Sequence, residues 1–219
     1  DIVPDILLCT DMVDVSTLLS LIRHCIHEVP VVLYMHENQL TYPWSHTDPD
    51  IKLKRDNHYG FINYTSVLAA DKVVFNSPYH RSSLLEALPG FLKQFPDFNN
   101  LSSIDSIERK SNVLPIGLNL SKFDEYSTLR AKKNAPVILW NHRWEYDKTP
   151  YEFFRLLQTL KARGQDFKLI ICGSKGEEYP SVFDEMREQF ADSLIHFGYA
   201  ANREQYASLL KQADVLPVT

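Results

Sequence analysis

The sequence has no apolar run long enough to cross a membrane and no excess of basic residues. Its longest apolar stretches, at 29–35, 137–140 and 169–172, have the length of β-strands, whereas a membrane-spanning helix needs about 20 apolar residues. The formal net charge is −5 at pH 7, which argues against a general nucleic-acid clamp because such surfaces are usually basic. With 44% hydrophobic and 23% charged residues, the 219-residue chain has the composition of a soluble globular protein of one large or two small domains.

The sequence also has few cysteines, and they are widely spaced. Cys9, Cys25 and Cys172 lie within or beside apolar segments. An odd number of separated cysteines suits neither a disulfide framework nor a zinc site, so buried reduced thiols in a cytosolic protein are expected. No signal peptide is visible, and a start at Asp1 rather than methionine leaves room for an upstream segment that has been removed.

Apolar, strand-length segments alternate with helical patterns along the whole chain. Strands are expected at 5–11, 31–37, 72–76, 112–117, 137–141, 167–173 and 194–199, with one more from 214 to the chain end. Helices are expected at 15–24, 56–70, 78–88, 150–163, 181–190 and 203–212, whereas 99–110 is expected to be irregular or weakly helical. The alternation predicts an α/β fold with two Rossmann-like parallel-sheet domains, an N-terminal one at 1–118 and a C-terminal one at 136–219, joined by a connection at 119–135.

Functional-group residues follow most of the predicted strands. They are Asp11, His36 with Glu37, Asn76 with Ser77, Gly117, His142 with Arg143, Gly173 with Ser174, and Gly198 with Tyr199. Ligands of open parallel sheets bind at the carboxyl ends of the strands. We therefore expect a ligand site at these ends, in a cleft between the two domains.

The segment 139–148 places two cations in the loop between a strand and a helix. Arg143 can grip phosphate oxygens with two parallel hydrogen bonds, and Lys148 can act as a movable point charge. The unpaired N–H groups of the helix that follows add partial positive charge. The pattern indicates a phosphate site; the alternative is that both cations are solvated and pair with Glu145 and Asp147.

Several long blocks of the chain resemble one family, that of the tRNA-queuosine α-mannosyltransferases, within the retaining GT-B glycosyltransferases of family four. These blocks are LLCTDMVDVSTLL, HENQLTYPWS, YGFINYTSVLAADKVVFNSPYHR, LPIGLNL, ILWNHRWEYDKTPYEFF and HFGYAANREQYASLLKQADV. The resemblance covers nearly all of the chain, and HENQLTYPW and WNHRWEYDK are long and unusual in composition. It implies a GT-B architecture, with an acceptor-side N-terminal domain and a C-terminal domain for the nucleotide sugar, in a chain that we expect to be truncated at both ends.

The resemblance also implies a reaction and places for its substrates. Mannose would move, with retention, from GDP-mannose to the cyclopentenediol of queuosine in a tRNA anticodon, without a metal or other cofactor and without stable membrane association. The protein would be cytoplasmic, with the nucleus as a further location. The implied donor-binding residues are Arg143, Lys148, Gly173, Gly198 and Tyr199, the acceptor-binding residues are His36, Glu37, Asn38 and Gln39, and the catalytic residues are His36, Arg143 and Lys148.

The chemistry of this transfer fits the residue types. Breaking the bond from the anomeric carbon to phosphate places charge on the leaving diphosphate, and Arg143 and Lys148 could stabilise it electrostatically. The sequence shows no DxD-like ligand pair at a suitable strand end; Asp11 and Asp14 are interpreted as strand-end polarity and helix capping. His36 could bond a sugar hydroxyl or simply the backbone.

The chain departs from the family pattern in two ways. His142 stands where much of the wider family has a glycine before the arginine, so either the loop takes a different path or its side chains donate hydrogen bonds themselves. The family's motif with two glutamates is expected beyond Thr219, and its first strand and glycine-rich loop before Asp5. The chain as given is therefore expected to bind poorly and to be inactive alone.

Two other interpretations stay open. A family-four transferase with a lipid or polysaccharide acceptor would present a basic, apolar helix to a membrane, and the helix at 15–24 is only mildly basic. A non-catalytic sugar-nucleotide- or tRNA-binding module would keep Arg143 and Lys148 but lack acceptor-side groups, and the HENQLTYPW block argues against that.

Overall fold

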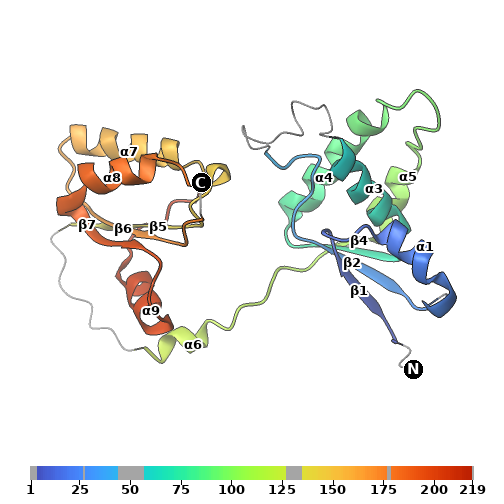
Figure 1. Cartoon of the computed structure of the whole chain (residues 1–219), viewed down its shortest axis with the longest axis horizontal. Coiled ribbons are helices and arrows are strands. Elements are labelled where there is room, and N and C mark those ends of the chain that lie inside the picture. The colour runs from blue at the N-terminus through green and yellow to red at the C-terminus, as the bar shows by residue number, and fades with distance from the viewer. Residues whose placement is uncertain (1–3, 27, 44–56, 127–134, 177–178, 219) are drawn as a thin grey trace. The chain divides into compact units, whose positions relative to one another are not determined.

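The chain divides into two compact units, Asp1–Gly117 and Leu118–Thr219, each of which is described by itself (Figure 1). The structure is a computed structural model, and it describes residues 4–26, 28–43, 57–126, 135–176 and 179–218. Each unit contains one parallel β-sheet with helices packed against it. The α/β class and the parallel sheets predicted from the alternating pattern are confirmed.

The first unit is a four-stranded parallel sheet with the strand order β1-β2-β3-β4. Its elements are β1 (Leu7–Thr10), α1 (Val15–Ile26), β2 (Val31–Met35), α3 (His58–Ala69), β3 (Lys72–Phe75), α4 (Pro78–Leu92), α5 (Ser103–Lys110) and β4 (Ser111–Val113). Thr10 pairs with Tyr34, and Met35 pairs with Phe75. The carboxyl ends of the first three strands therefore lie side by side.

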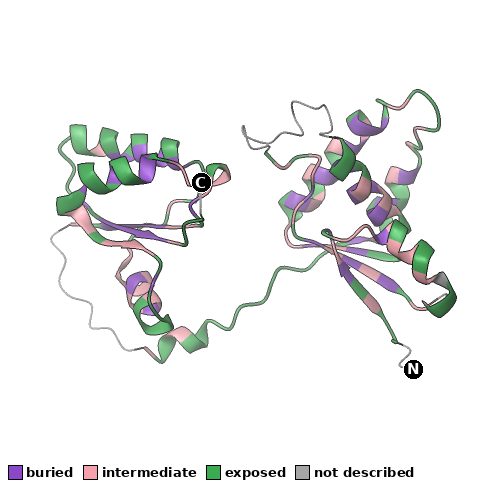
Figure 2. Ribbon diagram, in the orientation of Figure 1, coloured by how far each residue is buried: buried purple, intermediate pink, exposed green. Residues whose placement is uncertain are grey.

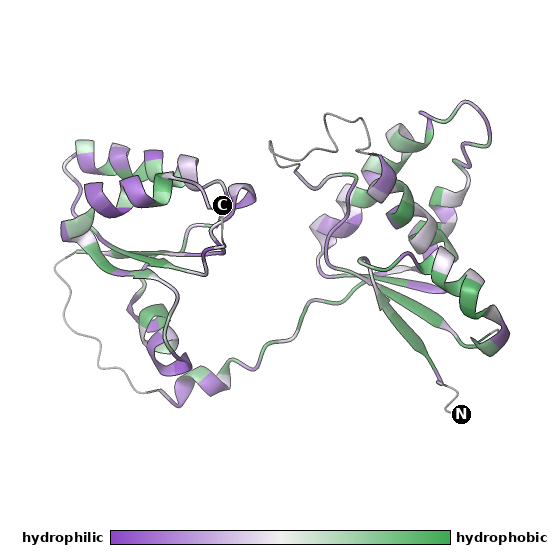
Figure 3. Cartoon of the chain, in the orientation of Figure 1, coloured by the Kyte–Doolittle hydropathy of each residue, from purple (hydrophilic) through white to green (hydrophobic). Residues whose placement is uncertain are grey.

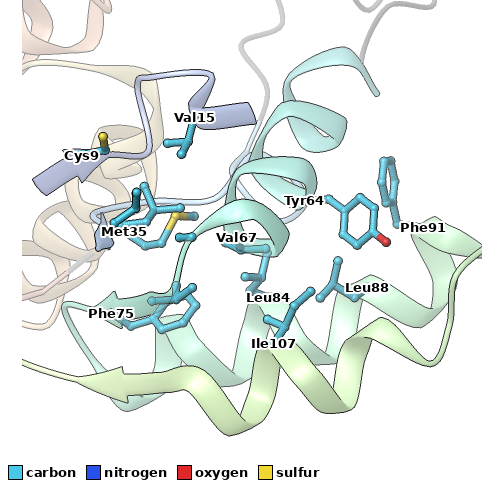
Figure 4. Close-up of a cluster of buried hydrophobic side chains, with 14 of the residues drawn as sticks. Cys9, Val15, Met35, Tyr64, Val67, Phe75, Leu84, Leu88, Phe91 and Ile107 are labelled. Carbon is cyan, nitrogen blue, oxygen red and sulfur yellow. The ribbon is translucent and has the colours of Figure 1, made fainter. Parts of the chain in front are cut away.

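One hydrophobic core fills the space between this sheet and its helices. Alternate residues of β2, namely Val31, Leu33 and Met35, point into it and are buried. They share one cluster with side chains from α3, α4 and α5, and Figure 4 shows Met35 in this cluster with Val67, Leu84 and Ile107. Truncating a buried leucine of this kind to alanine typically costs about 2–5 kcal/mol of unfolding free energy, so this core fixes the sheet that carries the strand ends.

The second unit is a three-stranded parallel sheet with the order β5-β6-β7. Its elements are α6 (Ser121–Asp124), β5 (Val137–Asn141), the 3₁₀ turn η1 (Tyr146–Lys148), α7 (Pro150–Ala162), β6 (Lys168–Cys172), α8 (Val182–Gln189), the 3₁₀ turn η2 (Ala191–Ser193), β7 (Leu194–Gly198) and α9 (Arg203–Gln212). Helices α7 and α8 cover one face of the sheet, and α9 covers the other (Figure 1).

Coverage on both faces explains the continuous apolar runs of β5 and β6. Trp140 and Ile171 belong to the core under α7 and α8, whereas Leu139 and Ile170 belong to the core under α9. Figure 2 shows these strands as the buried centre of the unit, and Figure 3 shows them as its most hydrophobic part. Strands buried on both faces lose the alternation of polar and apolar residues.

Two strands are shorter than the sequence predicted. The segment predicted at 112–117 pairs only at 111–113, and the segment from 214 forms a single bridge, Ile138 with Val215, within the described residues. Pro115 and Pro217 follow these pairs, and proline has no N–H to continue a ladder. The segment at 99–110 is more regular than expected, because 103–110 forms α5.

Within the part of the chain that the structure describes, no helix is both long and apolar enough to span a bilayer. The same residues contain no cluster of three or more histidine, cysteine, aspartate or glutamate side chains that could hold a metal ion.

Candidate functional site

The second unit holds a cavity of about 640 Å³ at the carboxyl ends of its strands. Its walls include Asn141 at the end of β5, Gly173 directly after β6 and Tyr199 directly after β7. The start of α9 lines it as well, through Asn202 and Arg203. This is the edge at which open parallel sheets bind their ligands, and we take the cavity as the main candidate site.

Gly173 allows two loops to approach each other closely beside this cavity. Its φ angle is +153°, and a Cβ atom here would lie 1.8 Å from the carbonyl oxygen of His142. The Trp144 N–H donates to the Ser174 carbonyl at 3.0 Å, and the Gly173 N–H donates to the Gly198 carbonyl at 3.1 Å. Both conformation and space therefore exclude a side chain at position 173.

Arg143 is the predicted cation that lines the cavity. Its side chain is 64% exposed, and its Nη1 lies 3.1 Å from Glu145 Oε1. An exposed ion pair of this kind contributes only about 0–1 kcal/mol. A ligand phosphate can therefore take the place of Glu145 at small cost. From the sequence we considered both an ion pair between Arg143 and Glu145 and a place for Arg143 at a ligand site. The structure shows the ion pair, and it also places Arg143 in the cavity wall.

Lys148 lies in the turn η1, just before α7. Its Nζ donates to Asp147 Oδ2 at 2.7 Å, and the Asp147 side chain is almost fully buried. In the described part of the chain, Lys148 is not among the residues that line the cavity. Of the two predicted cations, Arg143 thus stands at the cavity, whereas Lys148 pairs within its own loop.

Gly198 ends the third strand of this sheet, and Tyr199 follows it. Gly198 has a φ angle of +117°, and Tyr199 is 78% exposed and lines the cavity. Helix α9 begins nearby with Asn202 as its cap, whose Oδ1 accepts from the Gln205 N–H at 2.8 Å. An exposed ring and the N-terminus of a helix suit a planar group and a negative charge, respectively.

The cavity wall also contains residues that the sequence analysis did not name as ligand-binding, among them Asn141, Phe123 and Tyr206. Asn141 Nδ2 donates to the Tyr206 hydroxyl at 2.8 Å, and the Phe123 ring lies 6.1 Å from the Tyr206 ring, between centroids. Asn141 could have been predicted as a cavity residue, because it stands at the end of a strand. Phe123 and Tyr206 lie in helices far from that strand in sequence, so only the tertiary structure brings them to the wall.

His142, the residue before Arg143, has an unusual environment. Its Nε2 is buried and has no hydrogen-bond partner among the described residues, and its ring packs edge-on against Trp140 with 5.0 Å between centroids. Burial lowers the pKa of the His142 imidazole below its ordinary value of 6.5, and a hydrogen bond with the Pro217 backbone offsets this only in part. The ring is therefore neutral near neutral pH.

The first unit has a smaller cavity of about 320 Å³, also at the carboxyl ends of its strands. His36 after β2 and Asn76 after β3 line it. The His36 N–H donates to Asp11 Oδ1 at 2.8 Å, and its Nδ1 lies 3.0 Å from the same oxygen. The ring of His36 is thus held by a carboxylate, not by the backbone bond that the sequence left open as an alternative.

The other predicted acceptor residues have different surroundings. Glu37 and Asn38 line the same cavity as His36, but Gln39 lines a separate one of about 270 Å³. Asn38 is buried, and its Oδ1 accepts from the Thr41 N–H at 3.1 Å, so its side chain caps the following loop. Gln39 Nε2 donates to Glu37 Oε1 at 2.9 Å. Of the four predicted acceptor residues, His36, Glu37 and Asn38 thus line this cavity, and the Asn38 side chain also caps the loop.

Comparison with known proteins identifies the family. Residues 1–118, more than half of the chain, match the family described as tRNA-queuosine alpha-mannosyltransferase N-terminal. The chain belongs to this family. It is also 35% identical, over 192 residues, to a tRNA-queuosine alpha-mannosyltransferase of Drosophila melanogaster, an alignment that covers 84% of the chain and 49% of the relative. The chain thus spans about half the length of the curated relatives that it matches.

Solved structures show the same fold as this tRNA-queuosine alpha-mannosyltransferase family member. The catalytic domain of starch synthase IV from Arabidopsis thaliana aligns with a TM-score of 0.63 and 11% identity, over 98% of the chain and 52% of that protein. A trehalose-phosphate synthase from Burkholderia xenovorans aligns with a TM-score of 0.58 and 12% identity, over 100% of the chain and 53% of that protein. The predicted GT-B glycosyltransferase fold is confirmed.

Replacing Gly173 by alanine should destabilise the second unit strongly, because the new Cβ atom would collide with the His142 carbonyl. Gly164 is a matched control, since its φ is +71° but a Cβ there meets nothing within 4 Å. Gly164→Ala should cost about 1–2 kcal/mol from conformation alone, and Gly173→Ala clearly more. Denaturant unfolding monitored by circular dichroism measures both, and equal losses would contradict the close approach of the two loops.

The stability of the protein should fall as the pH is lowered past the ordinary histidine value of 6.5, because burial lowers the pKa of both His80 and His142. The unfolded chain takes up protons on these imidazoles at a higher pH than the folded chain does, so protonation favours unfolding. The free energy of unfolding, measured at about pH 7 and at about pH 5, gives the slope of stability against pH. The variants His80→Gln and His142→Gln should each reduce this slope. If both variants keep the wild-type slope, the two histidines are not the cause of the pH dependence.

Proposed function

We propose that the protein is a retaining mannosyltransferase that moves mannose from GDP-mannose to the cyclopentenediol of queuosine in a tRNA anticodon. The observation that carries the proposal is the match of residues 1–118 to the tRNA-queuosine alpha-mannosyltransferase family. The Drosophila relative of the same name and the glycosyltransferase fold support it. The proposed places of action are the cytoplasm and the nucleus.

The cavity of the second unit has the features that a nucleotide diphosphate requires. Arg143 offers an exposed guanidinium, the form that binds phosphate with two parallel hydrogen bonds. The N–H groups at the start of α9 add partial positive charge on the same wall. Tyr199 provides an exposed ring on which a purine can stack. Its volume of about 640 Å³ lies within the range of small-molecule sites, about 300–1,000 Å³.

In the proposed reaction, the acceptor hydroxyl oxygen bonds to the anomeric carbon while the bond from that carbon to the diphosphate oxygen breaks. The hydroxyl proton passes to the leaving phosphate oxygen on the same face, so no protein base is needed. Arg143 stabilises the charge that develops on the diphosphate. Lys148 is proposed as a second cation of the same loop, and it would share its ammonium between Asp147 and the ligand. The proposed mechanism uses neither a metal nor another cofactor.

The cavity of the first unit is proposed as the place where a hydroxyl-bearing group meets the protein. His36 and Glu37 line it with side-chain groups that bond hydroxyls well. Asn38 lines the same cavity, and its Oδ1 also caps the following loop by accepting from the Thr41 N–H.

A transfer assay with the full-length protein tests the proposal against its alternatives. Labelled GDP-mannose is offered with queuosine-containing tRNA and, separately, with a lipid extract. Label in tRNA supports the proposed reaction. Label in lipid would show that the acceptor is a lipid instead of tRNA. Tight binding of GDP-mannose without turnover would indicate a non-catalytic module.

Arg143→Ala in the full-length protein should lower kcat/KM by about ten- to a hundredfold, since a charge-assisted hydrogen bond contributes about 1.5–3 kcal/mol. The fold should stay intact, because the side chain is largely exposed. Arg163→Ala is a matched control: it removes an exposed arginine that lies at the far end of α7. Wild-type kinetics for Arg143→Ala, or an equal loss for Arg163→Ala, would refute the role of Arg143.

A further inference from the structure

Asp11 is a buried carboxylate placed next to His36 by the register of the sheet. It follows β1 directly, as His36 follows β2, and the pairing of Thr10 with Tyr34 sets the two residues beside each other. The Asp11 side chain is only 3% exposed. Burying a charge without a partner is costly, so a carboxylate at this position needs hydrogen-bond donors.

The hydrogen bonds of Asp11 decide which nitrogen of His36 carries the hydrogen. Asp11 Oδ1 accepts the backbone N–H of His36 at 2.8 Å and lies 3.0 Å from Nδ1. An ionised carboxylate can only accept hydrogen bonds, so Nδ1 must be the protonated nitrogen of the ring. In a neutral imidazole the other nitrogen, Nε2, is then an acceptor.

Neighbouring residues hold the ring of His36 in this orientation. The ring of Tyr34 lies 4.9 Å from it, between centroids, and the Tyr34 hydroxyl donates to the Leu114 carbonyl at 2.7 Å. Asn76 Nδ2 donates to the His36 carbonyl at 2.8 Å. The N–H and C=O of His36 are therefore both fixed, while its side chain remains 45% exposed and lines the cavity of about 320 Å³.

We propose that Asp11 is a positioning residue, which keeps His36 in the Nδ1–H form and so presents Nε2 as a hydrogen-bond acceptor to a ligand hydroxyl. Among the described residues no group bonds Nε2. An acceptor at this point selects a group that donates, such as the hydroxyl of a sugar or of a diol, and disfavours a carbonyl or a phosphate oxygen. The identity of the hydroxyl rests on the proposed function, whereas the form of the ring does not.

Nitrogen-15 NMR of labelled histidine side chains, at a pH where the ring is neutral, tests the ring form without any substrate. The His36 signals are assigned by their absence in His36→Gln. The wild-type chain should show a protonated Nδ1 and an unprotonated Nε2. Asp11→Ala should shift the ring toward the Nε2–H form, and Asp11→Asn, which keeps an oxygen acceptor, should restore Nδ1–H at least in part. A protonated Nε2 in the neutral wild-type ring, or no change in Asp11→Ala, would overturn the proposal.

Asp14→Ala is the matched control for this experiment. Asp14 belongs to the same loop and is also a carboxylate, but its Oδ1 accepts from the Thr17 N–H at 3.0 Å and so caps α1. Its removal should lower stability and leave the His36 ring form unchanged. A shift of the His36 ring in Asp14→Ala would show that the effect is not specific to Asp11.

Kinetics of the full-length protein test the consequence for the ligand. Asp11→Ala should lower kcat/KM about tenfold, and Asp11→Asn less. Because Asp11 acts through His36, the double variant with His36→Ala should be no worse than His36→Ala alone. Additive losses would overturn the positioning role.

Varying each substrate in turn identifies the hydroxyl. A raised KM for GDP-mannose places the hydroxyl on the sugar, and a raised KM for tRNA places it on the acceptor diol. A loss confined to kcat, with both KM values unchanged, would contradict hydroxyl binding in the ground state. Absence of any transfer by the wild-type protein would refute the proposed function but leave the NMR result standing.

Discussion

The parallel register of each sheet is the constraint on which both candidate sites depend. Since Thr10 pairs with Tyr34 and Met35 with Phe75, the residues that follow these strands meet at one edge. The same holds in the second sheet, where Asn141 pairs with Cys172, and Cys172 with Gly198. Neither site is formed by residues adjacent in sequence. Each consists of residues at the ends of neighbouring strands, whose register is fixed by backbone hydrogen bonds. The buried cores beneath the strands keep these edges in place.

Most helices and strands could be predicted from the sequence because their hydrophobic periodicity is strong. Continuous apolar runs at β5 and β6 and the spacing of the helices led to two parallel sheets, and the strand ends of the second sheet were placed correctly. Features set by single prolines or by weak patterns were predicted less well. The early end of β4 and the regular helix α5 are examples. In α5 the buried Ile107 contributes to the core, and such tertiary burial outweighs a polar, Ser-rich composition.

The site could be predicted only as far as residue type and strand position determine it. Arg143 and Tyr199 were predicted because each follows a strand, and both line the cavity of the second unit. Asp11 was interpreted as simple strand-end polarity, because its contact with His36 depends on a side-chain direction that the sequence does not show. For Asn38 the sequence allowed either contact with a ligand or a cap of the following loop, and the structure shows the cap, with Asn38 Oδ1 accepting from the Thr41 N–H.

The close approach of Gly173 to His142 has a consequence for how a ligand is received. Because the Trp144 N–H also donates to the Ser174 carbonyl, a hydrogen bond joins the loops after β5 and β6 beside this close backbone contact. The backbone of Arg143, which lies between His142 and Trp144, is thereby restrained before any ligand arrives. A cation on a restrained backbone loses less conformational entropy on binding than a cation on a mobile loop. More of its electrostatic attraction to the ligand therefore contributes to the binding free energy.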